Sequence, residues 1–269
     1  MKNILVPIDF SEHSNYAVEV AVDLAKKNGA TILLLHCVEL PRRFVTESTS
    51  ALPEELFFMR EAGLNVKKLS EELKSKGVAV KTVVETTALT YAVKHLLEDE
   101  SVDFIVMGST GATGSKELFL GSNAEKIVRT SSVPVLVIKD KTDISKVKKL
   151  TFACDFSQKY IDAFQKAVAF ANVLDAKIDF VYINTPYHFN SSREIKVLID
   201  NFSKEHKEIL SHNIHMYSEE GIIHFTEDHQ SDLICMFPTK QSALMHIFNG
   251  SISEDIVNHS EKPVLTIKL

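Results

Sequence analysis

The sequence predicts an α/β protein built from two tandem doubly wound domains, each an open five-stranded parallel sheet flanked by helices. Two observations carry this prediction. Apolar runs alternate with stretches of helical periodicity along the whole chain, and the same series of runs occurs twice. The runs are apolar throughout rather than alternately polar, which is typical of parallel strands whose two faces are both covered by helices.

In the first copy, the spacing of apolar residues separates strands from helices. After a first apolar run, Ala17, Val20, Ala21 and Leu24 recur at helical spacing, and Asn28-Gly29 ends that helix. The same reasoning gives the remaining elements. Strands are expected at 4–8, 32–38, 78–84, 104–107 and 135–138, with helices at 11–27, 54–76, 88–98 and 123–130.

The second copy repeats the first in the same order. "KNILVPIDFS" (2–11) corresponds to "KKLTFACDFS" (148–157), and "SVPVLVIK" (132–139) corresponds to "EKPVLTIK" (261–268). A polar, charged linker at 139–149 separates the copies, so we predict domains at 1–140 and 149–269. Strands of the second copy are expected near 150–154, 178–183, 214–218, 233–236 and 264–268.

Composition excludes several classes of partner. The net charge is −6 and is divided equally between the two copies, so there is no basic patch of the kind that nucleic acid or anionic lipid requires. No stretch approaches the roughly 20 apolar residues of a membrane-spanning helix. Cys37, Cys154 and Cys235 lie inside apolar runs, as reduced core thiols do. We therefore expect a cytoplasmic protein that binds neither nucleic acid nor a membrane.

The segment "GSTGATGSKELFLGS", from Gly108 to Ser122, holds four of the nine glycines. It begins where the fourth strand ends and finishes where the next helix opens. Gly108 and Gly111 permit positive φ and close approach of the backbone. Ser122 or Asn123 can cap the helix, whose first N–H groups form an anion site. The segment matches neither a Walker A loop nor Gly-x-Gly-x-x-Gly. It is either a cradle for phosphates or a mobile surface loop.

Two charged residues near this segment admit a structural and a functional interpretation. Asp9 ends the first strand, where a carboxylate can accept hydrogen bonds from ribose hydroxyls, but it can equally cap the helix that begins at Ser11. Lys116 can reach a phosphate or remain a solvated surface lysine. The residues alone leave both alternatives open.

The blocks "ILVPIDFS", "LLLHCVE", "GSTGATGSKELFLGSNAEKIV" and "SSVPVLVIK" resemble the universal stress protein family, and the resemblance covers the whole chain as two tandem domains. The glycine segment is similar to the nucleotide motif of that family, Gly-x2-Gly-x9-Gly-Ser/Thr, at Gly108, Gly111, Gly121 and Ser122. The resemblance implies a Rossmann-like fold of the adenine nucleotide alpha hydrolase-like type.

The resemblance further implies that ATP binds at the strand ends of the first domain, accompanied by Mg²⁺ or Mn²⁺. Asp9 would meet the ribose, and no catalytic residue or metal-ligating side chain is assigned. The implied cofactor-binding residues are Pro7, Ile8, Asp9, Cys37, Val38, Met107, Gly108, Thr110, Gly111, Gly121, Ser122 and Asn123.

The second copy departs from this pattern. Alignment places Phe237 at the position of Gly108 and Lys240 at that of Gly111, and Pro238 removes a donor N–H. Asp155 persists at the position of Asp9. We therefore expect the second nucleotide site to be degenerate. Eight of the eleven histidines fall in this copy, and a metal site starting from His212-x-x-His215 lacks recognisable further ligands.

Three functions follow as hypotheses. The first is an ATP-binding regulatory module of a stress response, in which the two domains form an intramolecular pseudo-dimer through their last strands, with a homodimer or an unidentified protein partner as further assembly. The second is a slow ATP hydrolase, for which Glu12 and His13 are the only candidate groups. The third is an interaction scaffold that binds no nucleotide.

Overall fold

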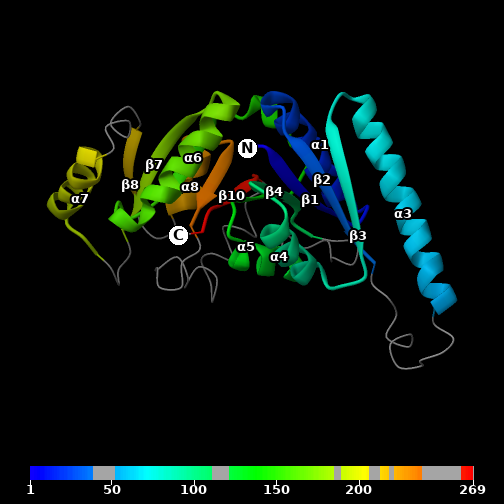
Figure 1. Cartoon of the computed structure of the whole chain (residues 1–269). Helices are drawn as coiled ribbons and strands as arrows, with labels where there is room; N and C mark the ends of the chain where they lie inside the picture. Colours follow the sequence, from blue (N-terminus) through cyan, green and yellow to red (C-terminus); the bar gives the residue numbers. More distant parts are fainter. Residues whose placement is uncertain are drawn as a thin grey trace. The chain divides into compact units, whose positions relative to one another are not determined.

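The computed structural model describes residues 1–38, 52–110, 121–184, 189–205, 213–217, 221–237 and 262–268 (Figure 1). These residues divide into two compact units, the first extending to Val135 and the second beginning at Leu136. Each unit is described by itself. Both contain parallel strands flanked by helices, which confirms the predicted α/β class.

The first unit follows the predicted alternation of strands and helices. Its elements match the predicted ranges to within a few residues. They are β1 (Asn3–Ile8), α1 (Glu12–Asn28), β2 (Thr31–Cys37), α3 (Leu52–Ser75), β3 (Ala79–Glu85), α4 (Leu89–Asp99), β4 (Phe104–Gly108) and α5 (Ser122–Thr130), which lead to β5 (Val135–Ile138).

The strands of the first unit pair in the order β3-β2-β1-β4, and all the pairs are parallel. The Ile105 N–H donates to the Pro134 carbonyl at 2.9 Å, so the chain leading into β5 continues the sheet beyond β4. Helices α1 and α3 cover one face of this sheet, and α4 and α5 lie together on the other (Figure 1). Because the chain leaves β1 toward β2 but returns from β3 to β4 on the opposite face, β1 and β4 flank the topological switch point.

Helix α1 shows how local sequence sets these elements. Ser11 caps its N-terminus by accepting the Ser14 N–H at 3.2 Å, and Gly29 ends it in the left-handed region at φ 65°. Its buried side chains, which include Val20 and Leu24, pack against β1, β2 and β4. In the described parts of the chain, no helix combines the length and hydropathy that a membrane span requires.

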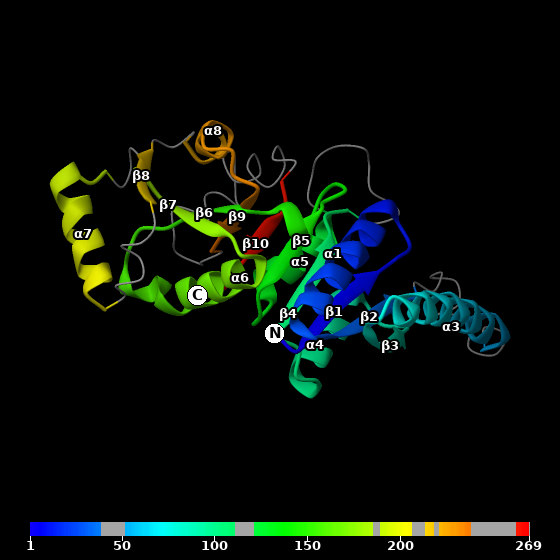
Figure 2. The same ribbon diagram turned by 90° about the horizontal axis from the view of Figure 1, so that it is seen from above.

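The second unit repeats this architecture. Its strands lie in the order β8-β7-β6-β9-β10, which matches the first unit strand for strand. Helices α6 and α8 lie on opposite faces of the sheet (Figure 2). The elements are η1 (Ile144–Lys146), β6 (Lys149–Ala153), η2 (Gln158–Tyr160), α6 (Ile161–Leu174), β7 (Lys177–Ile183), α7 (Ser192–Glu205), β8 (Asn213–Tyr217), α8 (Gly221–Asp228), β9 (Leu233–Met236) and β10 (Val264–Thr266).

The duplication extends to individual hydrogen bonds. In the first unit, Asp103 Oδ2 accepts the backbone N–H groups of Lys2 at 2.6 Å and Asn3 at 2.9 Å. In the second, Asp232 Oδ2 accepts the same pair of bonds from Lys148 at 2.8 Å and Lys149 at 2.9 Å. In each copy, one carboxylate therefore ties the start of the first strand to the start of the fourth. Burial alone would raise the pKa of Asp103, but these N–H donors outweigh it and the pKa is lowered.

The two cores differ in chemistry. The strands of the first unit bury mainly aliphatic side chains, whereas the second unit buries a cluster of aromatic rings. The ring centroids in this cluster lie 4.3–6.1 Å apart, within the range of favourable aromatic pairs. Its members are Phe152, Phe156, Phe164, Phe180, Phe202 and Phe237.

Lys139, which follows β5, is an exception to the rule that buried charges are paired. Its side chain is 8% exposed, and its Nζ has no hydrogen-bond partner in the part of the chain that the structure describes. Burial lowers the pKa of this ammonium to about 8. Lys268 occupies the equivalent position in the second copy and is exposed. The buried ammonium of Lys139 therefore destabilises the fold at any pH at which it is protonated.

We expect Lys139→Met to raise the free energy of unfolding at pH 7 by about 2 kcal/mol, because it removes a buried unpaired charge. The penalty is fully present below pH 8 and is relieved as pH rises toward the unfolded-state pKa of 10.5. The gain should therefore shrink across that range. Urea unfolding at pH 7 and pH 10 measures it, and Lys268→Met, which removes an exposed charge, is the control. Equal effects of the two substitutions would contradict this account.

Candidate functional site

The candidate site lies where the pairing of β1 with β4 stops. These strands pair at Ile4↔Phe104 and Leu5↔Ile105, whereas β1 continues to pair with β2 as far as Ile8↔His36. The carboxyl ends of β1 and β4 are thus freed from their mutual ladder at the switch point, where open parallel sheets bind ligands. Pro7, which has no N–H to donate, lies in this part of β1.

Asp9 shapes the turn that leaves β1. Its Oδ1 accepts the Ser11 N–H at 3.0 Å, and the intervening Phe10 takes a left-handed conformation at φ 62°. Ser11, not Asp9, provides the helix cap. The half-buried carboxylate therefore braces the turn at the end of the strand, and this position is compatible with the ribose contact implied by the family resemblance.

Gly108 is a glycine because α1 packs directly against it. A Cβ there would lie 2.8 Å from the backbone carbon of His13 and 2.9 Å from its carbonyl oxygen. Thr110 Oγ1 adds a hydrogen bond of 3.0 Å to His13 Nδ1. The expected close approach is confirmed at Gly108, but a positive φ is not needed there, since Gly29 and Gly77 are the only left-handed glycines among the described residues. The same expectation for Gly111 falls outside the described residues. The first partner of this bare backbone is the protein's own helix.

The far end of the glycine segment returns to the strand. The Gly121 N–H donates to the Ser109 carbonyl at 2.7 Å, so the two ends of the segment meet. Gly121 itself occupies the N-cap position at φ −60° and ψ 147°, and its carbonyl accepts the Glu125 N–H. The expected cap at Ser122 or Asn123 is therefore wrong by one residue. Gly121 has no side chain with which to cap α5, and no side chain of the other described residues caps this helix.

The other implied residues gather at the same edge of the sheet. Ile8 and Met107 are buried at the ends of their strands, and Cys37 and Val38 are half-buried at the end of β2. The Val38 N–H continues the ladder by donating to the Glu85 carbonyl at 2.7 Å. Gly111 and Lys116 lie outside the described residues.

Two aromatic residues at this edge, His36 and Phe10, are not predicted by the sequence to belong to the site. His36 Nδ1 lies 2.8 Å from the Ile8 carbonyl oxygen, and the His36 ring is 5.1 Å from that of Phe10, centroid to centroid. Phe10 remains 39% exposed. No spacing signal marked either residue, because their proximity depends on the pairing of β1 with β2.

The candidate groups for hydrolysis have structural partners. Glu12 is exposed and accepts a hydrogen bond from the Tyr16 hydroxyl at 2.5 Å, while His13 contacts Thr110. No group of three or more metal-ligating side chains occurs among the residues that the structure describes.

The corresponding edge of the second unit is built differently. Phe237 replaces Gly108, and its buried ring lies 4.3 Å from that of Phe152 and 5.3 Å from that of Tyr160. Gln158–Tyr160 forms a 3₁₀ turn where α1 has its first helical turn, because the ring takes the space into which a helix backbone would pack. Lys240 and His212 lie outside the described residues.

The turn after β6 keeps the geometry of the turn after β1, and its carboxylate is paired with a lysine. Asp155 Oδ1 accepts the Ser157 N–H at 2.9 Å, as Asp9 does for Ser11, but Asp155 also forms an ion pair with Lys159 at 3.1 Å. The pairing of β6 with β9 continues to Phe152↔Cys235, one residue further than the pairing of β1 with β4.

The fold defines the chain as a tandem α/β protein, in which each unit has parallel strands flanked by helices. The sequence model of the universal stress protein family matches residues 1–139 and again 146–268, so the chain belongs to that family. This result confirms the resemblance found in the sequence.

Individual relatives match either one copy or both. The chain is 31% identical to universal stress protein MJ0577 of Methanocaldococcus jannaschii over 155 residues, which cover 52% of this chain and 96% of that protein. It is 26% identical over its whole length to universal stress protein Slr1230 of Synechocystis, which is also covered completely. A universal stress protein structure from Archaeoglobus fulgidus has the same fold, with a TM-score of 0.73 at 20% identity over 99% of this chain and 98% of that one.

We expect Gly108→Ala to lower the free energy of unfolding by about 1–3 kcal/mol, because the new Cβ overlaps the backbone of His13 rather than a movable side chain. Denaturant unfolding measures the change. Gly63→Ala is the control, since nothing lies within 4 Å of a Cβ at that position in α3, and it should stabilise the protein by up to about 1 kcal/mol. A neutral Gly108→Ala would disprove the packing constraint.

Proposed function

We propose that the protein is an ATP-binding regulatory module of a stress response, in which the first domain alone binds ATP, with Mg²⁺ or Mn²⁺ on the phosphates. The observation that carries this proposal is the contrast between two equivalent strand ends. One has Gly108 and a short ladder, and the other has a buried Phe237 and a longer ladder.

In the first domain, the proposed ligand would meet complementary groups at both ends. The uncapped N–H groups at the start of α5 suit the phosphates, since the N-terminus of a helix favours negative charge. The carboxylate of Asp9 suits the ribose hydroxyls, which donate hydrogen bonds. The contact of Ser109 with Gly121 holds the end of β4 beside the start of α5, and that of Thr110 with His13 holds it beside α1.

In the second domain, the same positions serve the core and the surface. The ring of Phe237 belongs to the aromatic cluster, and Asp155 is engaged with Lys159. A nucleotide would have to displace both interactions. We therefore propose that the second domain does not bind ATP and has a structural role.

Equilibrium titration of the full chain with ATP and Mg²⁺ should give one site per chain. Asp9→Ala should weaken binding roughly tenfold, because it removes a charged acceptor of ribose hydrogen bonds. Asp155→Ala is the matched control, since it breaks the equivalent turn bond in the second copy and should leave ATP affinity unchanged. Isothermal titration calorimetry gives both the stoichiometry and the affinity.

Gly111→Val tests the phosphate end separately and should abolish binding by placing a β-branched side chain in the glycine segment. Two ATP molecules per chain would refute the assignment to one domain. Equal losses in Asp9→Ala and Asp155→Ala would refute the proposed role of Asp9.

A further inference from the structure

A groove lined by charged side chains lies at the amino-terminal edge of the strands of the second unit. The groove has a volume of about 560 Å³ and opens where the strands begin, at Lys149 of β6 and Lys177 of β7. This edge lies far along the strands from the positions equivalent to the nucleotide site. The groove is lined by Lys146, Lys148, Lys149, Asp175, Lys177, Gln230 and Asp232.

Lys149 and Lys177 have no lysine at the equivalent positions of the first copy, whereas Lys148 corresponds to Lys2. At the equivalent positions of the first copy, Lys149 corresponds to Asn3 and Lys177 to Thr31, whereas Asp232 corresponds to Asp103 and keeps its structural role. The second copy has thus acquired basic side chains at an edge that the first copy leaves uncharged at these two positions.

The two carboxylates of the groove differ in how strongly they interact with the ammonium groups of these lysines. Asp232 Oδ2 is engaged by two backbone N–H groups. Asp175 lies 3.7 Å from the Lys148 ammonium, but its side chain is 99% exposed, and exposed pairs of this kind are weak and screened by salt. Lys146 likewise pairs with exposed Asp143 at 3.1 Å. Lys177 has no carboxylate within ion-pair distance in the described part of the chain.

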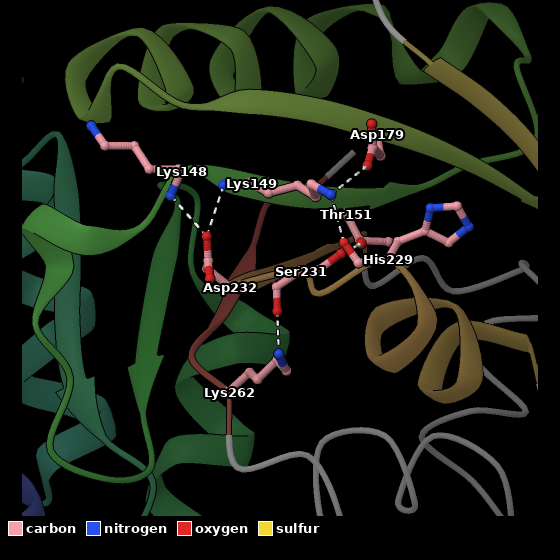
Figure 3. A network of polar contacts seen from close by, with 8 residues as sticks. All are labelled: Lys148, Lys149, Thr151, Asp179, His229, Ser231, Asp232 and Lys262. Carbon is pink, nitrogen blue, oxygen red and sulfur yellow. Dashed lines mark hydrogen bonds and ion pairs between the residues drawn. The ribbon is translucent and has the colours of Figure 1, made fainter.

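The ammonium of Lys149 is held by two polar contacts, with Asp179 and with the His229 carbonyl (Figure 3). It donates to the His229 carbonyl at 2.6 Å and lies 3.9 Å from Asp179 Oδ2, whose side chain is only 4% exposed. A buried hydrogen bond joins Thr151 and Ser231 beside this pair, and Lys262 donates to the Ser231 carbonyl.

These polar residues also distinguish the two copies. Asp179 and Thr151 stand where the first copy has Leu33 and Leu5 in its apolar core. Buried polar groups cost stability unless they are fully bonded, and here Asp179 pairs with Lys149 while Thr151 bonds to Ser231. The network thus fixes the direction of a cation that would otherwise be mobile.

We propose that this groove binds a small, multiply charged phosphorylated anion. Lysine ammonium groups act as point charges toward phosphate oxygens, and exposed Lys148 and Lys177 supply them, whereas the Lys149 ammonium is already engaged by the His229 carbonyl and Asp179. The volume suits a small molecule, and the net charge of −6 disfavours a long polyanion such as nucleic acid. The proposal is independent of nucleotide binding by the first domain.

Inorganic pyrophosphate is the probe. The full chain is treated at low salt with a limiting amount of an amine-reactive acetylating reagent. Mass spectrometry then gives the rate of acetylation of each lysine, with and without pyrophosphate. Bound pyrophosphate should slow acetylation of Lys177 and Lys148 severalfold and leave Lys166, an exposed lysine on α6, unchanged. Because the readout is specific to each residue, pyrophosphate bound in the first domain cannot mimic this result.

Affinity gives the second arm. Lys177→Thr, which restores the residue of the first copy, should weaken pyrophosphate binding roughly fivefold, whereas Lys166→Thr, with the same charge change, should not. Lys177 is exposed and outside the buried network, so the variant should fold, and its thermal unfolding verifies this. Unchanged acetylation rates at Lys177, or equal affinities of the two variants, would overturn the proposal.

Discussion

The first domain depends on a close contact between α1 and the end of β4. Because Gly108 has no side chain, the backbone of His13 can pack against it. A Cβ at Gly108 would lie only 2.8 Å from the backbone carbon of His13. This contact fixes the start of α1 next to β4, although the hydrogen-bonded ladder between β1 and β4 ends at Leu5↔Ile105. The ends of β1 and β4 therefore share no ladder hydrogen bonds beyond this pair and are held together by packing.

The second domain has the same topology, but different side chains pack at the end of its fourth strand. Phe237 occupies the position of Gly108 and joins an aromatic cluster, and a 3₁₀ turn replaces the first turn of the helix. The aromatic rings bury more apolar surface than glycine can, so the second domain gains packing where the first keeps an open strand end. The two copies thus differ at this edge, which has Gly108 against the helix backbone in the first domain and a buried aromatic ring in the second.

The second domain also carries polarity where the first is apolar. Lys149, Asp179, Thr151 and Ser231 form a bonded network near the amino edge of the sheet, at positions that include Leu5 and Leu33 of the first copy. Such a network costs stability unless each member is satisfied, and its contacts show that the members are bonded to one another or to the backbone. The two domains therefore differ at both edges of one shared framework.

The sequence by itself determined the class of the fold, the order of its strands and helices, the duplication and the family. Periodicity and repetition are properties of the chain, and they survive without knowledge of contacts. It also located the glycine segment at the end of β4, because Gly108 and Gly121 flank it in the printed order. The reason for Gly108, the cap at Gly121 and the pairing of Phe10 with His36 were decided only by the tertiary structure. Each depends on which segments pack side by side, and a residue's spacing along the chain carries no information about the helix that approaches it.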